Sequence, residues 1–199
     1  MTRRQALLIL GSSATLLVGI PLAWSLHTSF RFPSDHIPEG AYVRITLAFG
    51  NSHLEDCFAF LETESQHALF SIHDFRKRSF ERIRESFEEP DRSRLLELYR
   101  AEGTAAGPPQ EWAVIAHARG WDARIRRDLS GIQSVEVVGD RATIQTVAGT
   151  RYPFRRADNG IWGLTSFTPE LVEHKERAAR DFAIIDSAAH DYDIARGQK

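Results

Sequence analysis

Four short runs of alternating apolar and polar residues, separated by turn sequences, limit what this chain can fold into. The runs cover residues 133–138, 141–147, 151–156 and 161–167. An alternation with a period of two is typical of strands that are buried on one face. The connections are too short for a helical crossover, and they carry Gly, Asp and Asn, which tolerate the backbone of tight turns. We therefore predict a four-stranded antiparallel meander.

The predicted sheet has one apolar and one polar face. The apolar face consists of Val135, Val137, Ala142, Ile144, Tyr152, Phe154, Trp162 and Leu164. The polar face consists of Glu136, Gln145, Arg151, Arg155 and Thr165. Because an apolar face must be covered, we expect helices to pack on it, which gives an α+β fold.

Helical periodicity precedes the predicted sheet. Apolar residues recur at spacings of three and four over residues 54–87, with a bend near 62–65, and shorter helical stretches follow at 92–101 and 110–119. The segment 41–49 fits either a strand or a helix. We favour a helix because Pro38-Glu39 is a good helix opening.

A long helix is predicted to follow the sheet. Thr168-Pro169-Glu170 supplies a capping hydroxyl, a proline at the first helical position and an acidic residue near the positive end of the helix dipole. An apolar stripe then runs to about residue 195. We expect it to pack on the sheet or on the first helices, or to bind a second copy or a partner protein.

The first residues are typical of an export signal. Residues 6–26 carry no charged side chain, and Arg3 and Arg4 precede them. A helix of that length reaches about 30 Å, which matches a bilayer core, and the arginines orient its start toward the cytoplasm. We therefore predict a location in the bacterial cell envelope, in the periplasm or at the outer face of the cytoplasmic membrane.

Two fates of this segment stay open. Ala23 and Ser25 fit a cleavage site after Ser25, whereas an uncleaved helix would anchor the protein in the membrane through residues 6–26. The sequence Thr2-Arg3-Arg4-Gln5-Ala6-Leu7 resembles a twin-arginine leader, although Ala6 replaces the usual aromatic residue.

The predicted organisation has three parts. Residues 1–26 are a signal peptide or membrane anchor, 27–39 a linker, and 40–199 a single α+β domain. The domain comprises helices within 41–120, the sheet within 132–167 and the C-terminal helix at 169–195.

Composition excludes several classes of function. Beyond Arg4 the chain has 27 acidic and 23 basic residues, a net charge of −4, so we expect no nucleic-acid partner. A single cysteine, Cys57, allows no internal disulfide. Glu64 and His67 have helical metal-ligand spacing, but a di-iron bundle needs a second such pair and further carboxylates. We therefore predict no metal and no cofactor.

Two groups of residues are candidate binding surfaces. One comprises aromatic residues that form the core or line an apolar pocket: Trp112, Trp121, Tyr152, Phe154 and Trp162. The other comprises arginines that could bind an anion or a partner at one edge of the sheet: Arg124, Arg127, Arg151 and Arg155. His53 and Cys57 are four residues apart, but no third group is evident to orient a nucleophile.

A family resemblance follows from the order of these elements. Residues 138–144, Tyr152-Pro153-Phe154-Arg155 and 159–164, with their Gly-x-Trp step, are similar to the sheet of secreted bacterial members of the nuclear transport factor two and ketosteroid isomerase superfamily. The resemblance implies a cone-shaped α+β fold, and the helix after Thr168 departs from it. It carries over no catalytic residue.

The sequence therefore predicts a non-catalytic binding or assembly module. The alternative is an isomerase- or hydrolase-like enzyme with an acid–base pair in a cone-shaped apolar pocket.

Overall fold

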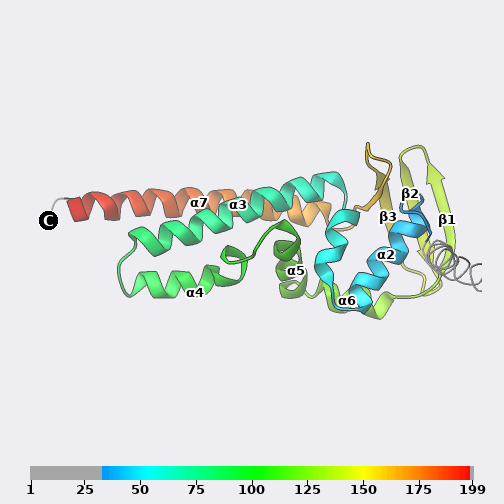
Figure 1. The fold of residues 1–199 in the computed structure, drawn as a ribbon, viewed down its shortest axis with the longest axis horizontal. Helices are drawn as coiled ribbons and strands as arrows, with labels where there is room; N and C mark the ends of the chain where they lie inside the picture. The colour runs from blue at the N-terminus through cyan, green and yellow to red at the C-terminus, as the bar shows by residue number, and fades with distance from the viewer. Residues whose placement is uncertain (1–32, 198–199) are drawn as a thin grey trace, which may run out of the picture. The chain divides into compact units, whose positions relative to one another are not determined.

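A computed structural model describes residues 33–197, and Figure 1 shows their fold. The chain divides into two compact units, Met1–Ser34 and Asp35–Lys199, and all the elements below belong to the second. The predicted signal peptide or anchor, residues 1–26, and the first part of the predicted linker lie outside the described residues. Over residues 33–197, no helix has the length and apolar character needed to cross a bilayer.

Along the chain, helices come both before and after the sheet. Before it come α2 (Pro38–Gly50), the 3-10 helix η1 (Leu54–Phe60), α3 (Thr63–Ser86), α4 (Asp91–Gly103), α5 (Pro108–Ala118) and α6 (Trp121–Asp128). After it comes α7 (Thr168–Gly197). The segment that fitted either a strand or a helix is thus helical, as favoured.

The sheet is the predicted antiparallel meander. Its strands are β1 (Ile132–Val138), β2 (Arg141–Thr146), β3 (Arg151–Arg156) and β4 (Trp162–Leu164), in spatial order β1-β2-β3-β4. Each connecting turn contains one glycine with positive φ, at Gly139, Gly149 and Gly160, where a side chain would be strained. The last strand ends at Leu164, so the prediction that it extends to residue 167 was wrong.

The apolar face of the sheet is buried except along β1. Residues on β2, β3 and β4 that were predicted to face the core are buried: Ala142, Ile144, Tyr152, Phe154, Trp162 and Leu164. On β1, Val135 is half-buried and Val137 is 53% exposed. β1 and β4 are both edge strands, but β4 is covered by α2 and η1 and is buried, whereas the cover over β1 is incomplete.

The first helices cover this face. The helix α2 contacts β1, β2 and β4, and η1 contacts β4. Tyr42, Ile45 and Phe49, on α2, join the same hydrophobic core as the sheet residues. Trp112 and Ile115, on α5, extend this core beyond the sheet.

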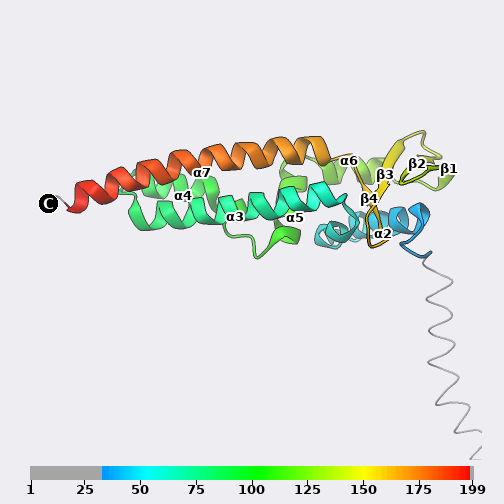
Figure 2. The same ribbon diagram turned by 90° about the horizontal axis from the view of Figure 1, so that it is seen from above.

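The remaining helices form a bundle. The long helices α3 and α7 lie side by side in both views, and α4 packs on α3 (Figures 1 and 2). A second, smaller hydrophobic core lies between α3 and α7. It consists of Ile83 on α3, Phe87 at the C-cap of α3, and Ile185 and Ala189 on α7. The C-terminal helix therefore packs on an earlier helix, one of the arrangements predicted for it.

Two helical boundaries differ from prediction. Residues 54–87 form two helices, because Leu61 leaves the helix to bridge Leu164 of β4. The helix α6 was missed, since its eight residues contain only two buried apolar side chains, Trp121 and Ile125, which give too short a pattern to identify.

Candidate functional site

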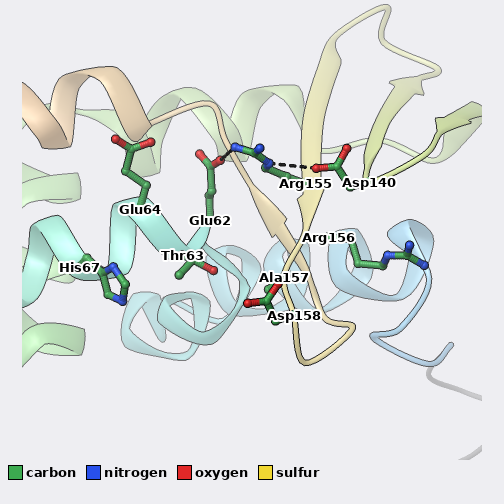
Figure 3. A pocket seen from close by; sticks show the side chains of 9 residues that line it. All are labelled: Glu62, Thr63, Glu64, His67, Asp140, Arg155, Arg156, Ala157 and Asp158. Atoms are coloured by element: carbon green, nitrogen blue, oxygen red, sulfur yellow. Dashed lines mark hydrogen bonds and ion pairs between the residues drawn. The ribbon is translucent and has the colours of Figure 1, made fainter.

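A polar cleft of about 400 Å³ lies between the start of α3 and the ends of the central strands (Figure 3). Its lining residues share a charged or polar character, Ala157 apart: Glu62, Thr63, Glu64, His67, Asp140, Arg155, Arg156, Ala157 and Asp158. We call this set the polar cleft. Its volume falls in the range of small-molecule sites, but such sites are usually lined mainly by apolar residues.

A close backbone approach fixes one wall of the polar cleft. Glu62 N donates to Leu164 O over 3.1 Å, and Leu61 bridges Leu164. A Cβ on Gly163 would lie 2.7 Å from the backbone of Glu62, so only glycine fits there without displacing a strand or the start of α3. Gly163, the residue directly after the Gly-x-Trp step, thus allows Glu62 to lie against the sheet.

A chain of hydrogen bonds then orients the Glu62 carboxylate. Thr168 Oγ1 donates to Glu62 Oε2 over 2.6 Å. Ser65 Oγ lies 2.8 Å from Thr168 Oγ1 and donates to it, because the Thr168 proton is already committed. All three residues are buried. The chain joins the first turn of α3 to the first turn of α7.

An arginine completes the wall. Arg155 Nη1 lies 3.4 Å from Glu62 Oε1, and Arg155 Nε lies 3.2 Å from Asp140 Oδ2 (Figure 3). The hydrogen bond from Arg155 lowers the pKa of Asp140, and the hydrogen bonds to Asp140 and Glu62 raise the pKa of Arg155. The guanidinium is therefore neutralised by two carboxylates.

Other charges in the polar cleft lack such partners. Among residues 33–197, the carboxylates of Glu64 and Asp158 form no ion pair. The Arg156 guanidinium lies 5.8 Å from the ring centroid of Trp162, within the range of a cation–π contact. The polar cleft therefore offers both carboxylate and guanidinium groups to a ligand.

A second polar cluster is buried among the helices. Arg76 of α3 donates to Glu102 of α4 over 2.8 Å and to Asp181 of α7 over 2.7 Å. His174 Nε2 lies 3.0 Å from Glu102 Oε2, and Arg119 Nη2 lies 3.1 Å from His174 Nδ1. Burial alone would raise the pKa of Glu102, but His174 and Arg76 lower it overall. This cluster links three helices of the bundle.

Glu111 on α5 is the most unusual titratable group near this cluster. Its side chain is 0% exposed, and its Oε1 has no hydrogen-bond partner. Burial, with a smaller contribution from Glu102, raises its pKa to about 8. Its Oε2 lies 3.4 Å from His73 Nδ1, and burial lowers the pKa of His73. At neutral pH Glu111 therefore keeps its proton.

The four predicted arginines do not form one site. Arg155 lines the polar cleft, whereas Arg151 lies at the other end of β3, opposite Gln145 of β2. Arg124 and Arg127 are exposed on α6. Of these four arginines, Arg155 alone lines the polar cleft and forms ion pairs with two carboxylates within residues 33–197.

The five predicted aromatic residues all belong to the core. Trp112 and Trp121 pack against Phe167, with ring centroids 5.1 and 4.7 Å away. Tyr152 packs against Tyr42 with centroids 5.6 Å apart. Trp112 Nε1 donates to Leu54 O, and Trp162 Nε1 donates to His36 O. Phe154 is buried, and its strand also borders a shallow cleft beside Thr165.

The lone cysteine sits in apolar surroundings. Cys57 is fully buried, its Sγ lies 3.8 Å from Ile45 O, and burial raises its pKa to about 12. His53 pairs with Asp56 instead. A thiol so far from ionisation is a poor nucleophile.

Sequence reasoning missed the most ordered members of both polar groups. Thr168 lies 106 residues after Glu62 and 103 residues after Ser65, and no local pattern links it to them. Glu111 follows two prolines at the start of a helix, where an acidic residue is ordinary. Neither a family model, nor a curated protein, nor a solved structure matches this chain.

Proposed function

We propose that this protein is a non-catalytic binding module that holds a charged segment of a partner protein in the polar cleft. The observation that supports this most is that the apolar face of the sheet is covered by the protein's own side chains. Phe154 of the sheet is 2% exposed, and Trp112 and Phe167, which belong to the same hydrophobic core, are 0% and 1% exposed. The polar cleft, in contrast, is open to a ligand.

The lining of the polar cleft suits a ligand that carries both charges. Arg155 is already neutralised by Glu62 and Asp140, which makes it part of a rigid wall. Glu64, Asp158 and Arg156 supply the charges that a ligand would meet. A peptide segment with basic and acidic side chains would match them. Its charges would contribute more to binding in the correct register than to the affinity.

The experiment is site-specific photocrosslinking in the native cells. A photoreactive amino acid at Asp158 is expected to give a discrete adduct with one partner, because Asp158 is exposed at the rim of the polar cleft. The matched control is the same amino acid at Glu136, which is exposed on β1 away from the polar cleft. Glu64→Lys in the same chain should reduce the Asp158 adduct several-fold.

Two results would contradict the proposed binding of a partner in the polar cleft. Identical adducts from Asp158 and Glu136 would mean that capture reflects random collision. A persistent Asp158 adduct in the Glu64→Lys variant would mean that the charges of the polar cleft do not select the partner.

We also propose that the module works in the bacterial cell envelope. Support comes from the uncharged segment 6–26 behind Arg3 and Arg4. Cell fractionation and the mass of the mature protein test this. An intact chain in the membrane fraction indicates an anchor, loss of about 25 residues indicates a cleaved signal, and an intact chain in the cytosol contradicts the proposal.

The relationship to the nuclear transport factor two and ketosteroid isomerase superfamily remains part of the proposal. Helices followed by an antiparallel meander support it, and the packing of α7 on α3 is outside the pattern of that family. A sequence profile built from newly determined relatives of this chain would test it.

An enzyme is the second candidate, favoured by Glu111 and Glu102. Their environments move the two carboxyl pKa values apart, as in an acid–base pair. Hydrolysis or isomerisation of a model substrate that is lost in Glu111→Gln, with the fold intact, would favour this candidate over the binding module.

A further inference from the structure

The outward face of α7 carries a line of residues at coiled-coil spacing. Arg180, Ile184, Ser187, Asp191 and Ile194 follow one another at intervals of four, three, four and three residues. An average spacing of 3.5 residues keeps side chains on one face of an α-helix. We call these five residues the outer seam.

The outer seam is separate from the face of α7 that packs within the chain. The buried residues of α7 include Leu171, Ala178, Ile185 and Ala189. Ile185 and Ala189 share a core with Ile83 of α3, and α7 runs alongside α3 (Figure 2). By contrast, all five residues of the outer seam are exposed, Ile184 to 69% and Ile194 to 46%. The outer seam thus presents two exposed isoleucines, ten residues apart, with Ser187 and Asp191 between them.

The charges of the outer seam determine which occupant fits. Among residues 33–197, neither Arg180 nor Asp191 forms an ion pair. Arg180 lies in the first half of α7 and Asp191 in the second half. A parallel copy would place arginine against arginine and aspartate against aspartate. An antiparallel copy would place the arginine of each chain against the aspartate of the other, which gives two pairs of opposite charge.

We propose that two copies of this chain associate through the outer seam as an antiparallel helix pair. Arg180 of each copy lies against Asp191 of the other. In the same register Ile184 lies against Ser187 of the second copy, and Ile194 lies against the aliphatic stem of Arg177. The small side chain at Ser187 leaves room for Ile184, and Ala183 and Ala188 beside the seam permit close approach.

The size of the contact sets its strength. From Arg177 to Ile194 the helix is about 26 Å long, and each copy contributes two isoleucines. One helix on each side is a small interface, so the dimer is weak and depends on concentration. The surface is distinct from the polar cleft, and this proposal does not depend on the proposed function.

The test is a charge exchange measured by sedimentation of the full chain in mild detergent, over a roughly hundredfold range of concentration. The wild type is expected to pass from monomer to dimer. Arg180→Asp alone places two carboxylates against each other at each end of the contact, and Asp191→Arg alone places two guanidinium groups against each other at each end. Each should weaken dimerisation about tenfold or more, which corresponds to about 1.4 kcal/mol.

The decisive sample is an equimolar mixture of the two variants. Each chain then finds its opposite charges on the other, so the mixture forms heterodimers at the concentration where the wild type dimerises. The double variant Arg180→Asp/Asp191→Arg should also dimerise. Arg127→Asp, a charge reversal on an exposed residue of α6, is the matched control and should behave as wild type.

Three results would overturn the proposal. These are a wild type that stays monomeric throughout, single variants that dimerise like the wild type, or a mixture that fails to associate. Circular dichroism is recorded for each variant to check that it is folded. Unfolding is not expected, because both substituted residues are exposed and unpaired in the described part of the chain.

Discussion

At the scale of single residues, Glu111 makes the stability of the protein depend on pH. Its pKa is raised to about 8 by burial, whereas an unfolded glutamate has a pKa of 4.5. At Glu111 the folded state therefore binds an extra proton between these values, so the contribution of Glu111 to the free energy of unfolding falls as pH rises from about 4.5 to about 8. Each unit of difference is equivalent to about 1.4 kcal/mol.

Glu111→Gln is expected to flatten this dependence. Glutamine keeps a donor near His73 and cannot ionise, so the variant should be close to wild type at pH 5 and more stable than wild type at pH 8. Urea unfolding at several pH values measures the difference. Parallel curves for the two proteins would show that Glu111 ionises freely in the folded state.

Arg76 is expected to stabilise the helical bundle. Its guanidinium is buried and bridges Glu102 and Asp181, so Arg76→Met removes a charged partner from both carboxylates, and Glu102 retains His174. We expect a loss of about 2 to 3 kcal/mol in the free energy of unfolding. The control is Arg94→Met, which breaks an exposed pair with Asp91 and should cost about 0.5 kcal/mol. Equal effects in chemical denaturation would contradict the difference in burial.

Cys57 should react only when the protein unfolds. Burial raises its pKa to about 12, so the thiolate is scarce and a reagent has no access to it. When the reagent is concentrated enough for labelling to outpace refolding, the rate of modification under native conditions should equal the global unfolding rate. Fast labelling without denaturant would mean that η1 opens by itself.

At the scale of elements, the contact between β4 and the start of α3 depends on Gly163. Gly163→Ala adds a Cβ 2.7 Å from the Glu62 backbone, and the strand or helix must move to accept it. The expected cost is about 2 kcal/mol, seen as a lower midpoint of thermal unfolding. Gly50→Ala, at the end of α2 with open space around its added Cβ, should be nearly neutral.

The sequence predicts an element well where neighbouring residues determine it, and poorly where a contact between distant residues determines it. The meander followed from alternation and turn glycines within about 35 residues, and β3 was placed at its observed bounds. The long C-terminal helix followed from the helix start at Thr168. The break between η1 and α3 was foreseen as a bend, but its cause, the bridge from Leu61 to Leu164, joins residues that no local pattern connects.

The candidate site shows the same division. Arg155 was predicted because alternation places it on the polar face of β3. Its separation from Arg151 follows from their distance of four residues, about 13 Å along a strand. Glu62 and Thr168 were not predicted, since their contact depends on how α3 and α7 meet the sheet.

At the scale of the whole molecule, the described unit combines a compact sheet with an aromatic core and a helical bundle. The proposed partner site lies on the sheet side of α3, and the proposed dimer surface lies on the outer face of α7. A module with two separate surfaces could bring two copies of a partner together, which is consistent with a role in assembly.

The claim that the protein binds through a polar cleft and not through an apolar pocket has a direct test. The measurement is a titration of the native protein with a small apolar dye, followed by dye and tryptophan fluorescence. Because Trp112, Trp121 and Phe167 pack against one another, we expect no saturable binding in the folded state. Saturable binding that quenches these tryptophans, and that is abolished by Ala142→Phe on the same face, would contradict the account.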